Sequence, residues 1–167
     1  GYSSNAGDFT LDVFEGAPCE CSSLCQAGDI PEGEPVCYDE YDDMFNGGCN
    51  SATPVFSDIA CGDTICGTAG TFLFTDPVFG LSEYRDTDWY RITLATSQIV
   101  TWTVTGNFPT LLGIVDTGGV DDCAGVADFY VADVVDPCTE GQVSALLPAG
   151  TWYLFVAPAD FTGIACG

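Results

Sequence analysis

Basic residues are almost absent from this 167-residue chain. It contains no histidine and no lysine, and its only basic side chains are Arg85 and Arg91. Without histidine it lacks the usual general base and cannot form a Ser-His or Cys-His catalytic pair. Without lysine it cannot form a Schiff base. Paired acids can hydrolyse glycosides, but among 25 Asp and Glu residues some pair falls near the required separation by coincidence. We therefore expect that the chain is not an enzyme.

The acids are left unbalanced, and the formal net charge is −23. Such a field repels nucleic-acid phosphates and anionic lipid, so we expect no nucleic-acid partner. The same charge opposes a compact fold unless something offsets it. Bound divalent cations would offset it, and high ionic strength, as in a halophilic source, is the alternative.

Long apolar segments are also missing. No run of 18 apolar residues occurs, so we expect no membrane insertion. The sequence starts at Gly1 with no secretory signal, which indicates a processed mature protein or one unit of a longer chain.

Cysteine, in contrast, is abundant, with ten residues. The absence of histidine excludes mixed Cys/His zinc sites. A four-cysteine site at Cys21, Cys25, Cys61 and Cys66 is disfavoured, because its spacings are longer than Cys-x-x-Cys. We therefore expect five disulfides and a secreted protein, extracellular or at the cell surface. The expected disulfide residues are Cys19, Cys21, Cys25, Cys37, Cys49, Cys61, Cys66, Cys123, Cys138 and Cys166.

Loop length guides the expected pairing. The pairs that close short loops are Cys37–Cys49, Cys123–Cys138 and Cys61–Cys66. A pair between Cys19 or Cys21 and Cys166 would hold the N-terminal strand beside the C-terminal end, within one chain or between two.

Three zones differ in pattern. Residues 1–14 contain a clean alternation at 8–14, which predicts a half-buried strand. Residues 15–67 are acidic and cysteine-rich, with many Gly and Pro, and indicate an irregular disulfide-linked region. Residues 68–167 contain repeated alternating segments separated by turn residues. The strands expected there are 71–75, 88–94, 98–105, 111–115, 128–135, 142–147 and 151–157. This spacing predicts an all-β fold, an antiparallel β-sandwich of the jelly-roll or immunoglobulin-like kind.

Two motifs in the third zone resemble a known family. Asp86-Thr-Asp-Trp-Tyr90 enters a strand, and Leu147-Pro-Ala-Gly-Thr-Trp-Tyr-Leu-Phe-Val156 follows about 60 residues later. Together they resemble the bacterial pre-peptidase C-terminal (PPC-like) domain, an accessory β-sandwich of secreted peptidases. The resemblance covers residues 68–167 and implies the fold more than an activity.

The wider chain resembles the repeat unit of very long, Cys-rich secreted proteins of environmental bacteria. The motifs that carry this resemblance are Ile30-Pro-Glu-Gly-Glu-Pro-Val-Cys37, Phe45-Asn-Gly-Gly-Cys-Asn50, Ile65-Cys-Gly-Thr68 and Val100-Thr-Trp-Thr-Val-Thr105. It implies an architecture and no enzymatic role.

Calcium is the expected cofactor. Ca²⁺ takes six to eight oxygens from carboxylates, Asn side chains and carbonyls. Asp86 and Asp88 lie two apart on a strand and can face one ion. In collagen-binding domains similar to the PPC-like family, a Glu-x-Glu and acids at a strand start are ligands, which implies Glu32 and Glu34 here. The expected ligand set is Glu32, Glu34, Asp42, Asn46, Asp86 and Asp88. The alternative is that these acids are simply solvated.

The N-terminal strand suggests self-association. Its apolar residues Phe9, Leu11, Val13 and Phe14 are too hydrophobic for a free terminus. PPC-like domains usually have a strand after the one equivalent to 151–157, which implies an open edge there. The predicted function is thus a calcium-stabilised structural subunit or repeat module of an extracellular filament or surface array, whose copies assemble head-to-tail by strand donation, in helical or tandem fashion. The alternatives are that the strand folds back on its own domain or that the copies are covalently in tandem.

A binding domain is the alternative function. A solitary accessory domain of a secreted protein would recognise an extracellular polysaccharide or a collagen-like ligand. Trp102 and Trp152 lie on apolar strand faces and indicate core. Trp89 shares its face with Arg91 and Thr93, so it is the candidate for an exposed sugar platform, or for a cation–π pair with Arg91.

Overall fold

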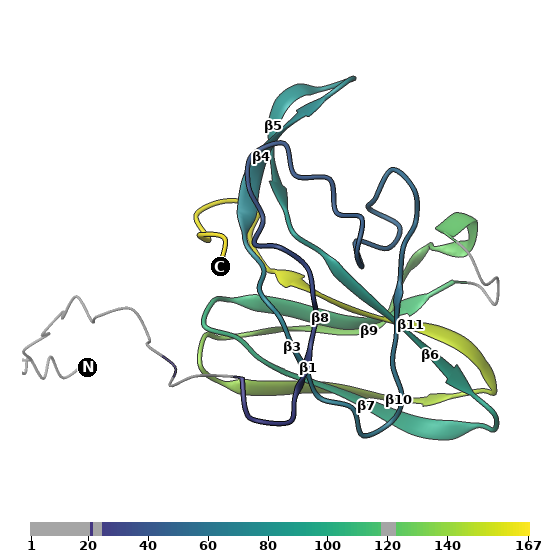
Figure 1. The fold of residues 1–167 in the computed structure, drawn as a ribbon. Coiled ribbons are helices and arrows are strands. Elements are labelled where there is room, and N and C mark those ends of the chain that lie inside the picture. Colours follow the sequence, from purple (N-terminus) through teal and green to yellow (C-terminus); the bar gives the residue numbers. More distant parts are fainter. Residues whose placement is uncertain (1–20, 22–24, 118–122) are drawn as a thin grey trace, which may run out of the picture.

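The computed structural model describes Cys21, residues 25–117 and residues 123–167. Two β-sheets form the body of the molecule (Figure 1). The larger sheet has the strand order β2 (Ser57–Asp58), β6 (Asp88–Leu94), β11 (Gly150–Pro158), β8 (Thr110–Asp116) and β9 (Asp128–Val135). The smaller sheet pairs β7 (Gln98–Thr105) with β10 (Glu140–Leu147). The prediction of an all-β sandwich is therefore confirmed.

Two further pairs lie outside these sheets. β4 (Thr71–Asp76) and β5 (Gly80–Arg85) form a hairpin that projects from the sandwich (Figure 1). β1 (Ile30–Pro31) and β3 (Ile65–Cys66) form a short parallel pair, and β2 also runs parallel to β6. The long sandwich strands thus pair antiparallel to one another, whereas the parallel pairs involve short strands of the acidic zone. The one helical element of the described residues is a 3-10 turn, η1 (Cys123–Gly125).

The main core lies between the two sheets. Alternation along β6 turns Tyr90, Ile92 and Leu94 inward, as the sequence pattern predicts. They meet Leu112 and Ile114 of β8, both fully buried. The remaining buried residues of this core are Val100, Val135, Val143, Leu147 and Leu154. Trp102 and Trp152 pack against it, which agrees with the prediction that they belong to the core.

A second core covers the opposite face of the larger sheet. Its buried members include Trp89, Tyr153 and Phe155, and Phe56 of the acidic zone packs against them. The prediction that Trp89 is exposed is wrong, because the acidic zone lies over this face. The Trp89 indole donates a hydrogen bond to Asn50 Oδ1 (2.9 Å).

The predicted pair between Trp89 and Arg91 is wrong for the same reason. Arg91 instead pairs with Asp58 of β2, with 2.6 Å between Nε and Oδ1. The aromatic platform that would have supported sugar recognition is therefore inside the protein.

Four disulfides connect distant segments. They are Cys21–Cys138, Cys25–Cys66, Cys37–Cys166 and Cys49–Cys123. The three short-loop pairs predicted from sequence are wrong, as is the pairing of Cys21 with Cys166. The physical reason is that the acidic zone folds across the sandwich, so three of its cysteines meet partners 74 to 129 positions away, and Cys66 pairs with Cys25 inside the zone. Cys61 is an exposed free thiol, and Cys19 lies outside the described residues.

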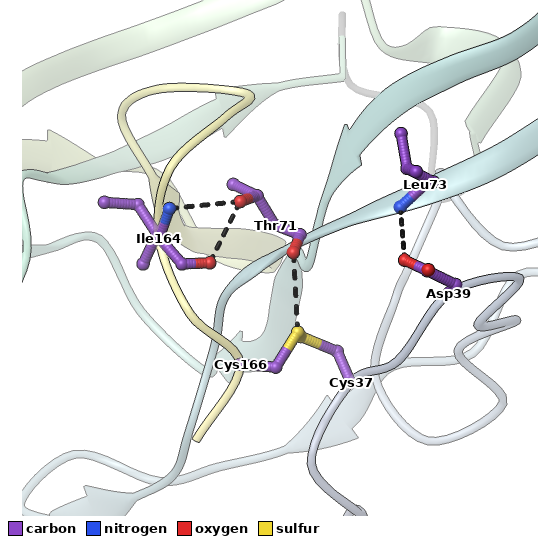
Figure 2. Close-up of a disulfide and its surroundings, with 6 residues drawn as sticks. All are labelled: Cys37, Asp39, Thr71, Leu73, Ile164 and Cys166. Carbon is purple, nitrogen blue, oxygen red and sulfur yellow. Dashed lines mark hydrogen bonds between the residues drawn. A yellow bond between two sulfur atoms is a disulfide. The ribbon is translucent and has the colours of Figure 1, made fainter.

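The C-terminal segment is fastened to the projecting hairpin (Figure 2). Cys166 is bound to Cys37, and the Thr71 hydroxyl donates to the Ile164 carbonyl (2.9 Å). The Ile164 amide donates back to the same hydroxyl (3.1 Å). Two residues further along β4, the Leu73 amide donates to Asp39 Oδ1 (3.0 Å), which ties in the acidic zone.

Strand β11 lies in the middle of the larger sheet. It pairs with β6 through Gly150–Val156 and with β8 through Tyr153–Pro158. The expectation of an open edge beside residues 151–157 is therefore wrong. The predicted N-terminal strand at 8–14, with Phe9, Leu11, Val13 and Phe14, lies outside the described residues.

Candidate metal centre

Acidic side chains from three segments converge at the start of β6. Glu32 and Glu34 follow β1, Asp43 and Asn46 come from the loop after Cys37, and Asp86 and Asp88 flank the entry to β6. One carboxylate oxygen from each of Glu32, Glu34 and Asp88 lies within 4.8 Å of the others, an arrangement that could hold a metal ion.

The loop after Cys37 is fixed to β6 by its backbone. The Trp89 amide donates to the Asn46 carbonyl (2.7 Å), and Asp43 Oδ1 accepts hydrogen bonds from the amides of Phe45 (2.7 Å) and Asn46 (3.2 Å). Gly48 has a φ of +53°, and any Cβ there would overlap the Trp89 ring. Glycine at this position lets the loop lie directly on the sheet.

Asn46 links two of the acids. It is fully buried, and its amide nitrogen donates to Glu32 Oε1 (2.7 Å) and to Asp88 Oδ1 (3.0 Å). The Tyr90 hydroxyl also donates to Glu32 Oε1 (2.7 Å), and the Thr68 amide donates to Glu32 Oε2 (3.1 Å). These donors orient Glu32 and Asp88 toward each other.

Several buried oxygens in this cluster have no hydrogen-bond donor. Asp86 and Asp88 are 2% and 3% exposed, although both are ionisable. The side-chain oxygens without a donor are both of Glu34, both of Asp86, Asp43 Oδ2, Asn46 Oδ1 and the Tyr41 hydroxyl. Buried polar atoms are normally paired, and an unpaired buried carboxylate is costly. A cation in their midst would satisfy them together.

Burial raises the pKa values of these acids. For Glu34, loss of hydration and then the charges of Asp86, Glu32 and Asp43 raise the pKa to about 10. For Asp86, loss of hydration is again the main cause and raises the pKa to about 7. The pKa of fully buried Asp88 also lies well above its usual range, first because of desolvation and then because of Glu32. Without a cation, the cluster therefore has to retain protons.

The donor set fits a hard cation. Its ligands are carboxylate and amide oxygens, with no sulfur or imidazole, so it does not suit zinc. Mg²⁺ usually keeps several waters and uses one or two carboxylates, whereas Ca²⁺ accepts six to eight protein oxygens in flexible geometry. The carboxylates of Glu32, Glu34, Asp43, Asp86 and Asp88, together with the Asn46 amide oxygen, form the oxygen-rich kind of site that Ca²⁺ accepts.

Most of the ligands expected from the sequence meet in this cluster. Glu32, Glu34, Asn46, Asp86 and Asp88 are there, but Asp42 is exposed and Asp43 stands in its place.

Sequence reasoning missed Asp43, Tyr41 and Tyr90. Asp43 could have been found from its Asx turn. Its Oδ1 accepts hydrogen bonds from the amides two and three residues later, which is a turn signal. The two tyrosines are indistinguishable from core residues in the sequence, and Tyr90 is part of the core except for its hydroxyl.

Comparison with family models, with curated proteins and with solved structures gives no match to this chain. The fold and the site therefore define the class: an acidic, disulfide-linked all-β protein in which, among the described residues, buried oxygens without a hydrogen-bond donor gather where a loop meets the sandwich. Among the described residues, no helix is long and apolar enough to cross a membrane.

Proposed function

We propose that the chain is a structural module of an extracellular filament or surface array, and that a calcium ion closes its acidic zone onto the sandwich. The observation that carries the proposal is the set of buried, donorless oxygens on Glu34, Asp43, Asn46 and Asp86. They come from segments far apart in the sequence, so an ion bound to all of them acts as a cross-link.

The molecule's charge supports this role. With a net charge of −23, the folded chain repels itself, and the acids of the cluster concentrate that repulsion at one place. A bound divalent cation removes it locally. Extracellular calcium is abundant enough to fill sites of modest affinity.

The disulfides support an extracellular location. They persist in oxidising compartments, and three of the four pairs of the described residues tie the acidic zone to residues 123–167, while Cys25–Cys66 closes a loop inside the zone. A small module that is held by disulfides and a cation resists unfolding outside the cell, which suits a load-carrying structural part.

Calcium titration tests the proposal. Chain stripped with chelator and dialysed at constant ionic strength should bind added CaCl₂ in a calorimeter and melt at higher temperature. A native-state ligand at 100 times its dissociation constant stabilises by about 2.7 kcal/mol. An unchanged melting curve on addition of calcium would show that the site is not a calcium site.

A matched pair of variants locates the binding. Asp86→Asn should abolish the calcium-dependent rise, because Asp86 is buried in the cluster. Asp42→Asn removes the same charge from an exposed neighbour and should keep the full rise. Equal responses from the two variants would mean that calcium acts by screening the surface charge.

A further inference from the structure

The smaller sheet has two strands, against five in the larger sheet. Among the described residues, no strand pairs with the outer edge of β7, which is eight residues long. Such an edge presents unpaired N–H and C=O groups that can take another strand. β9 and β10 are edge strands of the same length, but both contain acidic residues, whereas β7 has none.

The side chains of β7 are suited to a third strand. Val100, Trp102 and Val104 face the core, whereas Thr101 and Thr103 are exposed on the outer face. No residue of β7 is charged, in a chain whose net charge is −23. This is therefore a place where a second acidic copy can approach without meeting a row of carboxylates.

One end of this outer face is apolar. Ile99 of β7 and Leu146 of β10 are directly opposite each other in the register, and they are 71% and 63% exposed. These two aliphatic side chains form a small apolar spot on which a further apolar residue can pack.

Residues 8–14, which lie outside the described part, have a sequence that matches this edge. In an antiparallel register with Phe14 opposite Ile99, Val13 meets Val100 and Leu11 meets Trp102 on the core side. In the same register Phe9 meets Val104 on the core side, and Thr10 and Asp12 lie among the threonines of the outer face. Phe14 covers the apolar pair that Ile99 forms with Leu146.

The linker length favours a second copy as the donor. Cys21 is bonded to Cys138, and its sulfur is 3.6 Å from the Gly106 carbonyl, just beyond the last residue of β7. In this register Phe14 lies at the first residues of β7, about 24 Å away at roughly 3.4 Å per residue. The seven residues from Phe14 to Cys21 reach at most about 25 Å when fully straight. If residues 8–14 added to β7 of their own chain, the linker to Cys21 would have to be almost fully extended. A strand from a neighbouring copy is not limited in this way.

The free thiol gives an independent indication. Cys61 is exposed in a groove of about 710 Å³ at the start of β7, where Gln98 Nε2 donates to its sulfur (3.6 Å). Cys19 is two residues from Cys21, which lies at the far end of β7, so Cys19 extends at most about 7 Å from that end. It therefore cannot reach Cys61 of its own chain, at the start of β7. In a donated strand, Cys19 follows Phe14 by five residues and comes within reach of this groove.

We propose that residues 8–14 of one copy add to β7 of the next, and that Cys19 of the donor forms a disulfide with Cys61 of the acceptor. Two S–H bonds break and one S–S bond forms. The two electrons and two protons pass to an existing small-molecule or protein disulfide, which becomes two thiols. Donor and acceptor surfaces differ, so the contact does not close and produces a linear assembly. This inference deepens the proposed structural function and rests on it.

Mixed isotopes test the disulfide. Chain labelled with ¹⁵N and unlabelled chain are reduced, mixed, reoxidised with a glutathione redox pair in calcium, and digested without reduction. We expect a Cys19–Cys61 peptide in which half of the pairs are isotopically mixed. Pairs that are never mixed would place the bond within one chain, and alkylation of Cys61 in the assembled protein would show that the bond does not exist. Either result would overturn the proposal.

Two donor variants test the strand. Leu11→Asp puts a charge on the core side and should leave single copies by light scattering, while Thr10→Asp puts the same charge on the outer side and should still assemble. Equal assembly by both variants would overturn strand addition. The calcium-dependent melt of Leu11→Asp is the separating control. If calcium still raises the melting temperature of Leu11→Asp, a failure of assembly leaves the calcium proposal intact. If calcium does not raise the melting temperature of the wild-type chain either, the proposed function fails independently of strand addition.

Discussion

The two arginines of the chain do different things. Arg85 is half-buried, and its guanidinium donates to the carbonyls of Pro158 (2.7 Å) and Ala159 (3.0 Å) and lies 4.3 Å from the centroid of the Phe161 ring. Arg91 makes an exposed ion pair with Asp58. The first arginine fastens the segment after β11 to the hairpin, whereas the second sits on the surface.

Replacement of each arginine should separate these roles. Arg85→Met should lower the free energy of unfolding by about 2–3 kcal/mol, because hydrogen bonds from a charged group to buried carbonyls are lost. Arg91→Met should lower it by less than about 1 kcal/mol, as is usual for exposed pairs. Denaturant unfolding in calcium measures both. A larger loss for Arg91→Met would contradict this assignment.

At the residue scale, the sequence predicted side chains well where a period constrains them. Alternation placed Tyr90, Ile92 and Leu94 correctly. It failed for Trp89, because alternation distinguishes two faces of a strand and does not tell which is solvated when both are covered. It also could not choose Asp43 over Asp42, since an irregular loop has no period and the choice depends on the Asx turn.

In the acidic zone, disulfides connect the strands to the rest of the molecule more than sheet pairing does. Its strands β1, β2 and β3 have two residues each. Cys37–Cys166 spans 129 positions and joins this zone to the C-terminal segment beside β4 (Figure 2). Removal of a bond that closes so long a loop greatly increases the freedom of the unfolded chain.

The Cys37→Ser/Cys166→Ser double variant should therefore lose about 2–5 kcal/mol of unfolding free energy. Its unfolding transition should broaden, because the acidic zone unfolds before the sandwich. Cys61→Ser is the control, and its unfolding free energy as a single copy should match that of the wild type. Chemical denaturation of both in calcium decides the matter. A double variant as stable as Cys61→Ser would show that the disulfide contributes little.

Element boundaries were predicted closely in the last zone. Three strands, Asp88–Leu94, Gln98–Thr105 and Asp128–Val135, have the predicted ends, whereas Gly80–Arg85 was missed because Gly80, Ser82 and Glu83 weaken its alternation. The pairing of strands and cysteines was not predictable in the same way. Both depend on how the acidic zone crosses the sandwich, and nothing in a short window of sequence encodes that path.

For the whole molecule, the acid cluster determines how stability changes with pH. In the metal-free fold the pKa of Glu34 is raised to about 10 and that of Asp86 to about 7, mainly by burial. In the unfolded chain both ionise near pH 4. Between these limits the folded state binds more protons than the unfolded state, so its stability falls as pH rises.

Metal-free chain should accordingly be more stable at pH 5 than at pH 8, at equal ionic strength. With saturating calcium this trend should weaken or reverse, because ligands must lose their protons to bind the ion. The double variant Glu34→Gln/Asp86→Asn should show a flatter dependence than metal-free wild type. Urea midpoints at the two pH values measure it. A metal-free wild type that is more stable at pH 8 than at pH 5 would contradict the predicted direction of the pH dependence.

The position of β11 has a consequence for the order in which the fold can form. A chain that emerges N-terminus first must release residue 158 before β6 and β8 acquire the strand that lies between them. Until then only local pairs such as the β4–β5 hairpin can persist, because the sheet depends on contacts between distant positions. In the extracellular module that we propose, this delay would keep the chain unfolded during export, and the sandwich would close only after its last strand has arrived.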